Sequence, residues 1–202
     1  LPTGFRWTQK LKDSCYVGEI NVSGGNECNG AVITPFDSDK VLAGIKELVS
    51  KKAEAIAVIG TFSPLFQEQE LEVASIIEKY FPTVFYTLSH RIGSLGIVER
   101  RNATILNCAL GDVLKKGFLG LKQSLYDLKI MSDVFLCKNN GTLMNFEEAI
   151  NFPICTIASG PTNSFIGASH LVGEKNCIVV DVGGTSTDCG VILNSRAKKS
   201  TN

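Results

Sequence analysis

The chain has 202 residues, 44% of them hydrophobic, and 20 Lys and Arg residues balance 20 Asp and Glu residues to a net charge of zero. This length and apolar content allow a sizeable core in one large domain or two small ones. The neutral balance attracts neither nucleic acid nor an anionic membrane, so neither is an expected partner. No apolar run approaches the ~20 residues of a membrane span, and the N-terminus lacks a signal-peptide pattern, which favours a soluble protein.

Seven cysteines form an odd set with no Cys-x-x-Cys pair, and most stand in apolar runs. This pattern favours reduced, buried thiols in a cytoplasmic protein over a disulfide framework or a zinc site. The chain begins with Leu1 instead of Met and ends soon after an apolar hairpin. We therefore expect a fragment of a longer protein.

The first half of the sequence predicts alternating helices and strands. Residues 1–36 are interpreted as turns and short strands, because Ser-Gly-Gly-Asn at 23–26 breaks helices. Apolar residues at helical spacing predict a helix from Ser38, capped by Asp37 or Ser38. The run at 55–62 is apolar on both faces, which indicates a central strand of a parallel or mixed sheet.

A second helix is expected to open at Ser63-Pro64 and to be followed by a strand at 83–88. This α, β, α, β order predicts an α/β fold with right-handed crossovers. Beyond Gly96 the pattern predicts a long helix to Leu125, a strand at 134–137, a turn at 139–141, a helical turn at 146–150 and a helix at 165–172.

The stretch 177–193 predicts a strand, a tight turn and a second strand. Glycines in its turn bring backbone N–H groups close to a phosphate and tolerate positive φ, and the hydroxyls that follow add donors. These loop residues are Gly183, Gly184, Thr185, Ser186 and Thr187. Asp181 and Asp188 bracket the loop, and two carboxylates beside phosphates call for a hard cation such as Mg²⁺. A nucleotide with magnesium is the simplest ligand.

Two alternatives to this phosphate site stay open. Gly, Ser, Thr and Asp are ordinary turn residues, so the stretch also fits a plain β-hairpin. The segment 159–164, with Ser159 and Gly160, offers free N–H groups at a helix start and hence a second phosphate wall. By residue type alone it fits a capped helix start better.

Other polar groups give weaker signals. Arg100 and Arg101 could form an anion-binding fork, but a solvated surface fits their residue type better. Ser89 and His90 are neighbours in an expected strand and would point to opposite faces, so they do not pair as nucleophile and base. His170 is interpreted as a core histidine. The chain has no Walker loop and no dinucleotide, serine-hydrolase or His-Glu-x-x-His motif, so those classes lose support.

Four motifs in order resemble the hydantoinase A/5-oxoprolinase family. They start at Gly96 (Gly-Ile-Val-Glu-Arg-Arg-Asn-Ala-Thr), Asn139 (Asn-Asn-Gly-Thr-Leu-Met), Ala158 (Ala-Ser-Gly-Pro-Thr-Asn-Ser) and Val179 (Val-Val-Asp-Val-Gly-Gly-Thr-Ser-Thr-Asp). The match assigns residues 1–95 to the end of the family's N-terminal region and residues 96–202 to the start of its hydantoinase A region.

This resemblance implies incomplete actin-like ATPase lobes of ribonuclease-H type, with ATP between two lobes. It implies that members open lactam or hydantoin rings with ATP and that relatives carboxylate ketones. The family's second phosphate loop falls on the residues from Asp181 to Asp188, and its Ser-Gly-Pro segment falls on Ser159, Gly160 and Pro161.

The chain departs from the family pattern in three places. A first Asp-Gly-Gly-Gly-Thr-type loop is absent, Asn140 replaces a carboxylate of close relatives, and residues 195–199 do not continue the usual segment. An uncovered apolar face is therefore expected at the terminal hairpin, with marginal stability or association.

The leading hypothesis is an ATP-dependent hydrolase that opens a cyclic amide such as a hydantoin or 5-oxoproline. The γ-phosphoryl group would move to the amide oxygen and water would attack the activated carbon. The catalytic residues are unknown. A kinase-like phosphotransferase and a silent nucleotide-binding remnant remain alternatives, and a homo-oligomer or a partner subunit is left open.

Overall fold

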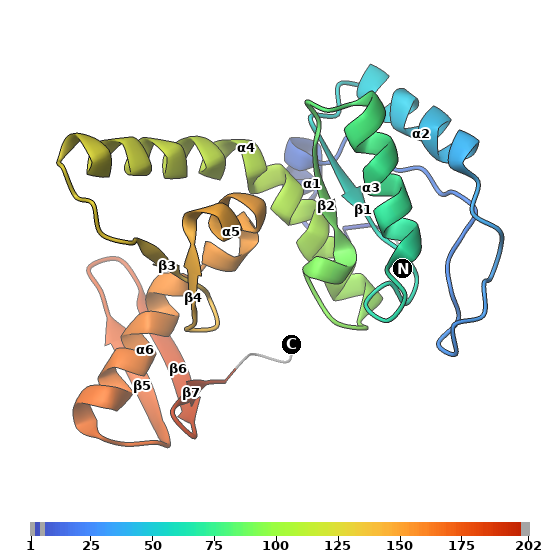
Figure 1. Ribbon diagram of the computed structural model, residues 1–202. Helices are drawn as coiled ribbons and strands as arrows, with labels where there is room; N and C mark the ends of the chain where they lie inside the picture. The colour runs from blue at the N-terminus through green and yellow to red at the C-terminus, as the bar shows by residue number, and fades with distance from the viewer. Residues whose placement is uncertain (1–2, 5–6, 199–202) are drawn as a thin grey trace. The chain divides into compact units, whose positions relative to one another are not determined.

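The computed structural model describes residues 3–4 and 7–198, and the chain divides into two compact units, Leu1–Val113 and Leu114–Asn202 (Figure 1). Unit 1 holds α1 (Gln9–Cys15), α2 (Ser38–Ser50), β1 (Ala55–Val58), α3 (Glu68–Tyr80), β2 (Phe85–Leu88), the 3₁₀ helix η1 (Ser89–Arg91) and the first part of α4 (Ile97–Asp127). Unit 2 holds the rest of α4, β3 (Phe135–Cys137), β4 (Leu143–Asn145), α5 (Phe146–Asn151), the 3₁₀ helix η2 (Pro153–Thr156), α6 (Ser159–Val172), β5 (Cys177–Val182), β6 (Thr187–Leu193) and β7 (Arg196–Ala197).

Unit 1 is a three-layer arrangement around a parallel strand pair. β1 and β2 pair in the register Ala55 to Phe85 through Val58 to Leu88. Helices α2 and α3 bury one face in a core made of Val41, Ile45, Ile56, Val73 and Ile77. The first part of α4 covers the other face, where Asn107 Nδ2 donates to Thr87 Oγ1 at 2.9 Å. The expected α/β alternation is confirmed.

The predicted central position of β1 is wrong within the described residues, because β1 has one strand partner there. Apolar residues on both faces of β1 are explained by the helices that cover each face, and a central strand is not required. The edge of β1 opposite β2 has no paired strand among the described residues.

Helix α2 starts as predicted, because Asp37 Oδ1 accepts a hydrogen bond from the Lys40 backbone N–H at 3.1 Å. Helix α3 begins at Glu68 and not at Ser63-Pro64. Phe62 adopts φ 53°, and its carbonyl accepts from Leu65 and Phe66, so residues 62–66 form a separate turn before the helix.

The N-terminal expectation of turns and short strands missed helix α1. Thr8 caps this helix through its Oγ1, which accepts from the Leu11 N–H at 3.3 Å. The glycine-rich run at 23–26 lies beyond the end of α1, so it does not interfere. The strand-like contact in this region is an isolated bridge between Asn26 and Val32.

Unit 2 contains two small antiparallel sheets. β3 pairs with β4 across the predicted 139–141 turn, where Gly141 has φ 82° and donates to the Lys138 carbonyl. The second sheet has the order β5-β6-β7, and α6 packs on β5 and β6. Helix α6 begins at Ser159, six residues before the predicted 165, and His170 on it is exposed instead of packed in the core.

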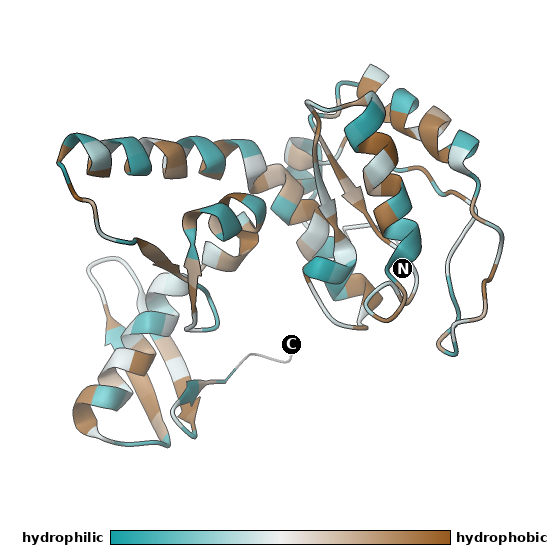
Figure 2. Cartoon of the chain, viewed as in Figure 1, coloured by the Kyte–Doolittle hydropathy of each residue, from teal (hydrophilic) through white to brown (hydrophobic). Residues whose placement is uncertain are grey.

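The side of β5 and β6 that faces away from α6 is apolar and exposed, as expected for this hairpin (Figures 1 and 2). Ile178 is 75% exposed, Val180 55% and Val182 74%. Their register neighbours on β6 include Val191, which is 41% exposed. Within the described chain, nothing covers this face.

All seven cysteines are free thiols, but the expectation that most are buried is wrong. Cys108 alone is buried, and burial raises its pKa to about 11, while Cys28 and Cys189 are exposed. Within residues 3–4 and 7–198, no helix combines the length and apolar character needed to cross a membrane.

Candidate functional site

The site predicted from the sequence lies on the β5-β6 hairpin of unit 2. The two strands pair in register from Cys177 opposite Ile192 to Val182 opposite Thr187. β-Branched residues favour this pairing, and Gly190 removes the side chain at the point where the Phe165 ring of α6 lies against β6. A Cβ at position 190 would stand 2.1 Å from a Phe165 ring carbon, so the glycine permits the close approach of helix and sheet.

Asp181 and Asp188 are direct cross-strand partners. Directly opposite residues of an antiparallel pair share one face and have Cβ atoms about 4.5–5.5 Å apart. Like charges in this arrangement destabilise the pair unless a cation lies between them. The structure therefore brings together the two carboxylates that the sequence singled out.

The connecting loop is short and open to solvent. Its backbone closes through a hydrogen bond from the Gly183 N–H to the Ser186 carbonyl at 2.9 Å. Neither Gly183 nor Gly184 has positive φ, so the predicted need for that conformation is not seen here. A Cβ on Gly184 would meet no atom within 4 Å, which leaves the space above its backbone free for a ligand.

The side-chain hydroxyl groups of this loop have no internal partners among the described residues. Thr185, Ser186 and Thr187 are exposed. Their side chains, like those of Asp181 and Asp188, make no hydrogen bond or ion pair with any residue that the structure describes. Donors that are not used in folding are available to an anion, which is the property a phosphate-binding loop needs.

The second predicted wall is the N-terminus of α6, with Ser159 and Gly160 in its first turn. Ala158 precedes the helix at φ 58°, and no side chain caps it. Residues 173–176 reverse the chain between α6 and β5, so the two run antiparallel and the start of α6 lies at the same end of unit 2 as the 183–187 loop (Figure 1). The helix start thus offers free N–H groups and the positive end of its dipole at that end.

The 139–142 turn is attached to this helix start. Thr162 Oγ1 on α6 donates to the Asn139 carbonyl at 2.9 Å. Asn140 uses its Oδ1 within the turn, where it accepts from the Thr142 N–H and hydroxyl. Lys138 forms an ion pair with Glu148, so its charge is compensated inside unit 2.

The donor set fits a magnesium ion that is shared with phosphates. Among the described residues there is no cluster of three or more His, Cys, Asp or Glu side chains that could hold a metal. Mg²⁺ is usually bound by one or two carboxylates, with waters and substrate phosphates completing the octahedron. The pair Asp181 and Asp188 supplies that number of carboxylates.

A second polar cluster, in unit 1, was missed by the sequence reasoning. Glu70 on α3 is 2% exposed and accepts four hydrogen bonds: from Gly60 N (2.7 Å) and Ser89 Oγ (2.5 Å) on Oε1, and from His90 N (3.1 Å) and His90 Nδ1 (2.6 Å) on Oε2. Arg100, also 2% exposed, donates to Ser89 Oγ, the Ser94 carbonyl and the Gly60 carbonyl.

We call these residues, together with Ser63, the Glu70 network. It corrects the interpretation of Arg100 as a surface or anion-binding residue. Ser89 and His90 lie in a 3₁₀ helix and not in the expected strand. Ser89 Oγ and His90 Nδ1 both bind the Glu70 carboxylate. Because His90 Nδ1 is used in this way, it does not act as a base toward Ser89. A sequence signal existed: Glu70 stands at helical spacing with the buried residues Val73, Ala74 and Ile77.

Comparisons with known proteins match both parts of the chain. The family described as Hydantoinase/oxoprolinase matches residues 100–202, and the Hydantoinase/oxoprolinase N-terminal region matches residues 5–81. The acetophenone carboxylase gamma subunit of Aromatoleum aromaticum is 26% identical over 186 residues, which cover 87% of this chain and 25% of the relative. The chain therefore spans about a quarter of that relative's length.

Two solved structures share the fold. A nucleotide-free structure of an acetone carboxylase, from work on ATP-dependent acetone carboxylation, has a TM-score of 0.71 at 22% identity and covers 87% of this chain and 26% of that one. The ATP-dependent caprolactamase of Pseudomonas jessenii has a TM-score of 0.70 at 19% identity and covers 84% of this chain and 25% of that one. At these identities the likeness shows the mixed helix and strand fold.

Proposed function

Because the chain belongs to the hydantoinase/oxoprolinase family, we propose that it carries one phosphate-binding wall of an ATP-dependent enzyme that opens a cyclic amide. The observation that carries the proposal is the 183–187 loop, whose hydroxyl groups are exposed and unused in folding and which the Asp181 and Asp188 pair brackets. The similarity to an ATP-dependent caprolactamase supports the cyclic amide as substrate class.

Each group has a defined role in this proposal. The backbone N–H of Gly184 and the hydroxyls of Thr185, Ser186 and Thr187 hold phosphate oxygens, whereas the Gly183 N–H closes the loop by donating to the Ser186 carbonyl. Ser159 and Gly160 offer N–H groups of the α6 start from the other side. Asp181 and Asp188 would hold Mg²⁺, which neutralises the charge of the phosphates when bound.

The chemistry follows from the poor reactivity of an amide carbonyl. The amide oxygen forms a bond to the γ-phosphorus while the bond from that phosphorus to the ADP oxygen breaks. Water then adds to the activated carbon, the ring C–N bond breaks with protonation of the nitrogen, and a second water releases phosphate from the acyl phosphate. The loop stabilises the charge on the moving phosphoryl group through fixed donors.

We further propose that the two units are incomplete actin-like lobes of ribonuclease-H type, with the family's N-terminal region ending near residue 95 and its hydantoinase A region beginning near residue 96. Catalysis by positioning then needs a second phosphate loop that residues 1–202 do not contain. Little or no ring opening is expected from this chain by itself.

Ketone carboxylation is a second candidate, favoured by the similarity to an acetophenone carboxylase subunit and to an acetone carboxylase. It also needs an activated oxygen, so the same loop would serve both reactions. The relative is named as a gamma subunit, and this supports a partner subunit for the present chain.

Product analysis of a longer protein that contains this chain tests the proposal. Hydantoin, 5-oxoproline and caprolactam are supplied with ATP and Mg²⁺, and acetone and acetophenone are supplied with bicarbonate as well. An open-ring acid with ADP and phosphate supports ring opening, and a carboxylated ketone supports the second candidate. A phospho-ester would indicate a kinase, and the lack of ATP consumption with every substrate would indicate a silent remnant. Multiple turnover of a cyclic amide by monomeric residues 1–202 would contradict the need for a second wall.

A further inference from the structure

The chain contains two Asn-Gly pairs, Asn29-Gly30 in unit 1 and Asn140-Gly141 in unit 2. An asparagine followed by glycine is prone to lose ammonia without an enzyme. The glycine backbone nitrogen attacks the side-chain amide carbon of the asparagine, and the missing Cβ leaves this approach uncrowded. Both asparagines are exposed to solvent. Both pairs are therefore candidates for the same covalent modification.

In unit 1 the pair closes a three-residue hairpin loop, 28–30, whose glycine has φ 89°. The Glu27 N–H donates to the Ala31 carbonyl at 2.8 Å, and the Gly30 N–H donates to the Glu27 carbonyl at 3.0 Å. Asn29 Oδ1 accepts from the Ala31 N–H at 2.9 Å. The Gly30 N–H and the Asn29 side chain are both held by this turn, so cyclisation requires the turn to open first.

In unit 2 the second pair closes the same kind of loop, 139–141, and its glycine has φ 82°. The Lys138 N–H donates to the Thr142 carbonyl at 2.7 Å, and the Gly141 N–H donates to the Lys138 carbonyl at 2.9 Å. Asn140 Oδ1 accepts from the Thr142 N–H at 3.0 Å. Because the two turns have the same local hydrogen bonds, their ease of opening depends on what holds each turn from outside.

The turn in unit 2 is held by several outside contacts. The Asn139 N–H donates to the Cys155 carbonyl at 2.7 Å, and Asn139 Nδ2 donates to the Ile154 carbonyl at 3.3 Å. The Asn139 carbonyl accepts from Thr162 Oγ1 at 2.9 Å. The ladder of β3 and β4, with three residue pairs, adjoins the turn. Opening the turn disturbs these bonds together, which makes opening costly.

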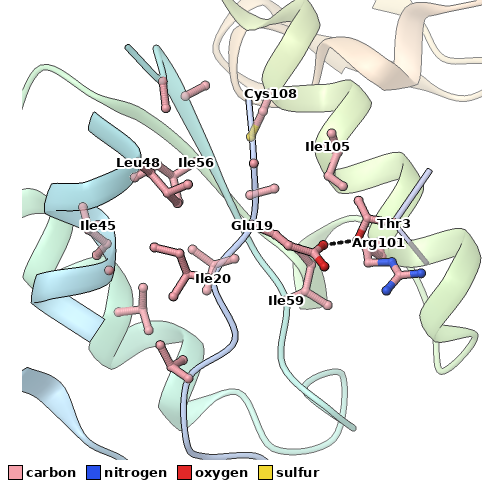
Figure 3. A pocket seen from close by; sticks show the side chains of 18 of the residues that line it. Thr3, Glu19, Ile20, Ile45, Leu48, Ile56, Ile59, Arg101, Ile105 and Cys108 are labelled. Carbon is pink, nitrogen blue, oxygen red and sulfur yellow. Dashed lines mark hydrogen bonds between the residues drawn. The ribbon is translucent and has the colours of Figure 1, made fainter. Parts of the chain in front are cut away.

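The turn in unit 1 has less support. A single bridge, between Asn26 and Val32, adjoins it, and residues 27–31 make no hydrogen bond with described residues outside the hairpin. Its contact with the rest of unit 1 is the Phe66 ring beside Gly30. The segment that leads into the hairpin lines a cavity of about 740 Å³ (Figure 3), so its packing is incomplete. Few contacts are lost when this turn opens.

We propose that Asn29-Gly30 is a site of spontaneous deamidation and that Asn140-Gly141 is protected by its outside contacts. In the opened turn, the Gly30 nitrogen forms a bond to Asn29 Cγ. The bond from Cγ to Nδ2 breaks, and that nitrogen leaves as ammonia with the proton of the Gly30 N–H. Water then opens the succinimide ring. Cleavage between the Gly30 nitrogen and Cγ gives aspartate, and cleavage between that nitrogen and the α-carbonyl carbon gives isoaspartate.

Either product changes the hairpin of unit 1. Both add a carboxylate two positions from Glu27. Isoaspartate also lengthens the main chain by a methylene, which breaks the hydrogen bond from the Gly30 N–H to the Glu27 carbonyl. Its free α-carboxylate stands on an exposed loop, where it is a substrate for an isoaspartyl methyltransferase. This inference does not depend on the proposed nucleotide site in unit 2.

The test follows both asparagines in the wild-type chain at neutral pH. Mass spectrometry of proteolytic peptides measures the conversion of amide to acid, and methyl transfer from S-adenosylmethionine by an isoaspartyl methyltransferase measures isoaspartate. Asn29 is expected to convert at least about tenfold faster than Asn140. In guanidinium chloride the two rates should agree within about twofold, because both pairs then lie in unfolded chain.

Two variants localise the effect. Thr162→Val keeps the shape of the side chain and removes the hydrogen bond to the Asn139 carbonyl. Asn140 should then convert about threefold faster or more, while Asn29 keeps its rate and serves as the internal reference. Asn29→Gln should remove most of the methyl acceptance, because glutamine cyclises far more slowly. The comparison of folded and unfolded wild-type chain keeps the test decisive even if Thr162→Val does not fold.

Three results would overturn the inference. Equal rates in the folded chain would show that the outside contacts of Asn139 give no protection. A rate difference that persists in guanidinium chloride would assign it to neighbouring side chains instead of the fold. Conversion of both asparagines in the unfolded chain, with no conversion of Asn29 in the folded chain, would show that the hydrogen bonds within each turn are sufficient protection.

Discussion

The Glu70 network of unit 1 and the 183–187 loop of unit 2 are both rich in polar side chains, but they satisfy their hydrogen bonds in opposite ways. Glu70 and Arg100 are buried, and their acceptors and donors are bound within the protein. The side chains of Thr185, Ser186 and Thr187 are exposed and make no hydrogen bond with the described residues. The difference separates polar groups that hold a fold together from polar groups that remain available to a ligand.

The largest effect is expected for the polar groups available to a ligand, at the 183–187 loop and its two aspartates. Asp181→Asn in a longer protein that contains this chain keeps the side-chain volume and removes the charge, so ATP turnover should fall by at least about 100-fold. Folding stability should stay within about 0.5 kcal/mol, because the Asp181 side chain makes no hydrogen bond or ion pair with the described residues. Asp133→Asn, at an exposed site of unit 2, is the control. Phosphate release and thermal unfolding measure both quantities, and unchanged Mg²⁺-dependent turnover in Asp181→Asn would refute the assignment.

A loss of folding stability is expected when the buried Glu70 network is changed. Glu70→Ala leaves the Gly60, Ser89 and His90 donors without their acceptor and removes the carboxylate charge that acts on the buried Arg100. The free energy of unfolding should therefore fall by about 3–5 kcal/mol. Glu72→Ala changes an exposed glutamate of the same helix and should cost less than about 0.5 kcal/mol. Urea unfolding of both variants checks this, and equal midpoints would show that the Glu70 network contributes nothing to stability.

Two glycines of the hairpin separate a role in folding from a role in ligand binding. Gly190→Ala would place Cβ 2.1 Å from the Phe165 ring, so α6 must shift and stability should fall by about 1–3 kcal/mol. Gly184→Ala meets no atom within 4 Å and has no positive φ, so it should leave stability unchanged while weakening ATP binding to the longer protein. Chemical denaturation and calorimetric titration separate the two effects, and the reverse pattern would contradict the assigned roles.

The smallest expected effect concerns the cap of α2. The Lys40 backbone N–H and side chain hold the pKa of Asp37 below its ordinary 3.8. A lowered pKa means that this carboxylate stabilises the fold above pH 3.8 and that the stabilisation is lost as pH falls through the lowered pKa. Asp37→Ala should therefore lower the melting temperature at neutral pH, with the difference shrinking in acid. Asp39→Ala, next to the cap, is the control, and an acid-independent difference would argue against the titration of Asp37.

The sequence was most informative where local pattern and local structure agree. The apolar spacing from Val41 onward and the capping Asp37 define α2 without help from the rest of the chain. The two apolar runs of 177–193, rich in β-branched residues, likewise predict the hairpin. The structure then pairs Asp181 with Asp188 across its strands. In both cases the information lies within about 20 residues.

The sequence alone determined the α/β alternation of unit 1, the terminal hairpin and the family motifs, because residue type and short-range spacing carry these. Tertiary structure decided the rest. It buried Glu70 and Arg100, which residue type places on the surface. It moved the start of α6 to Ser159 and left one edge of β1 free. These outcomes depend on contacts between segments distant in sequence, such as Gly60 with Arg100 and Phe165 with Gly190, and such contacts leave no periodic signal in the chain.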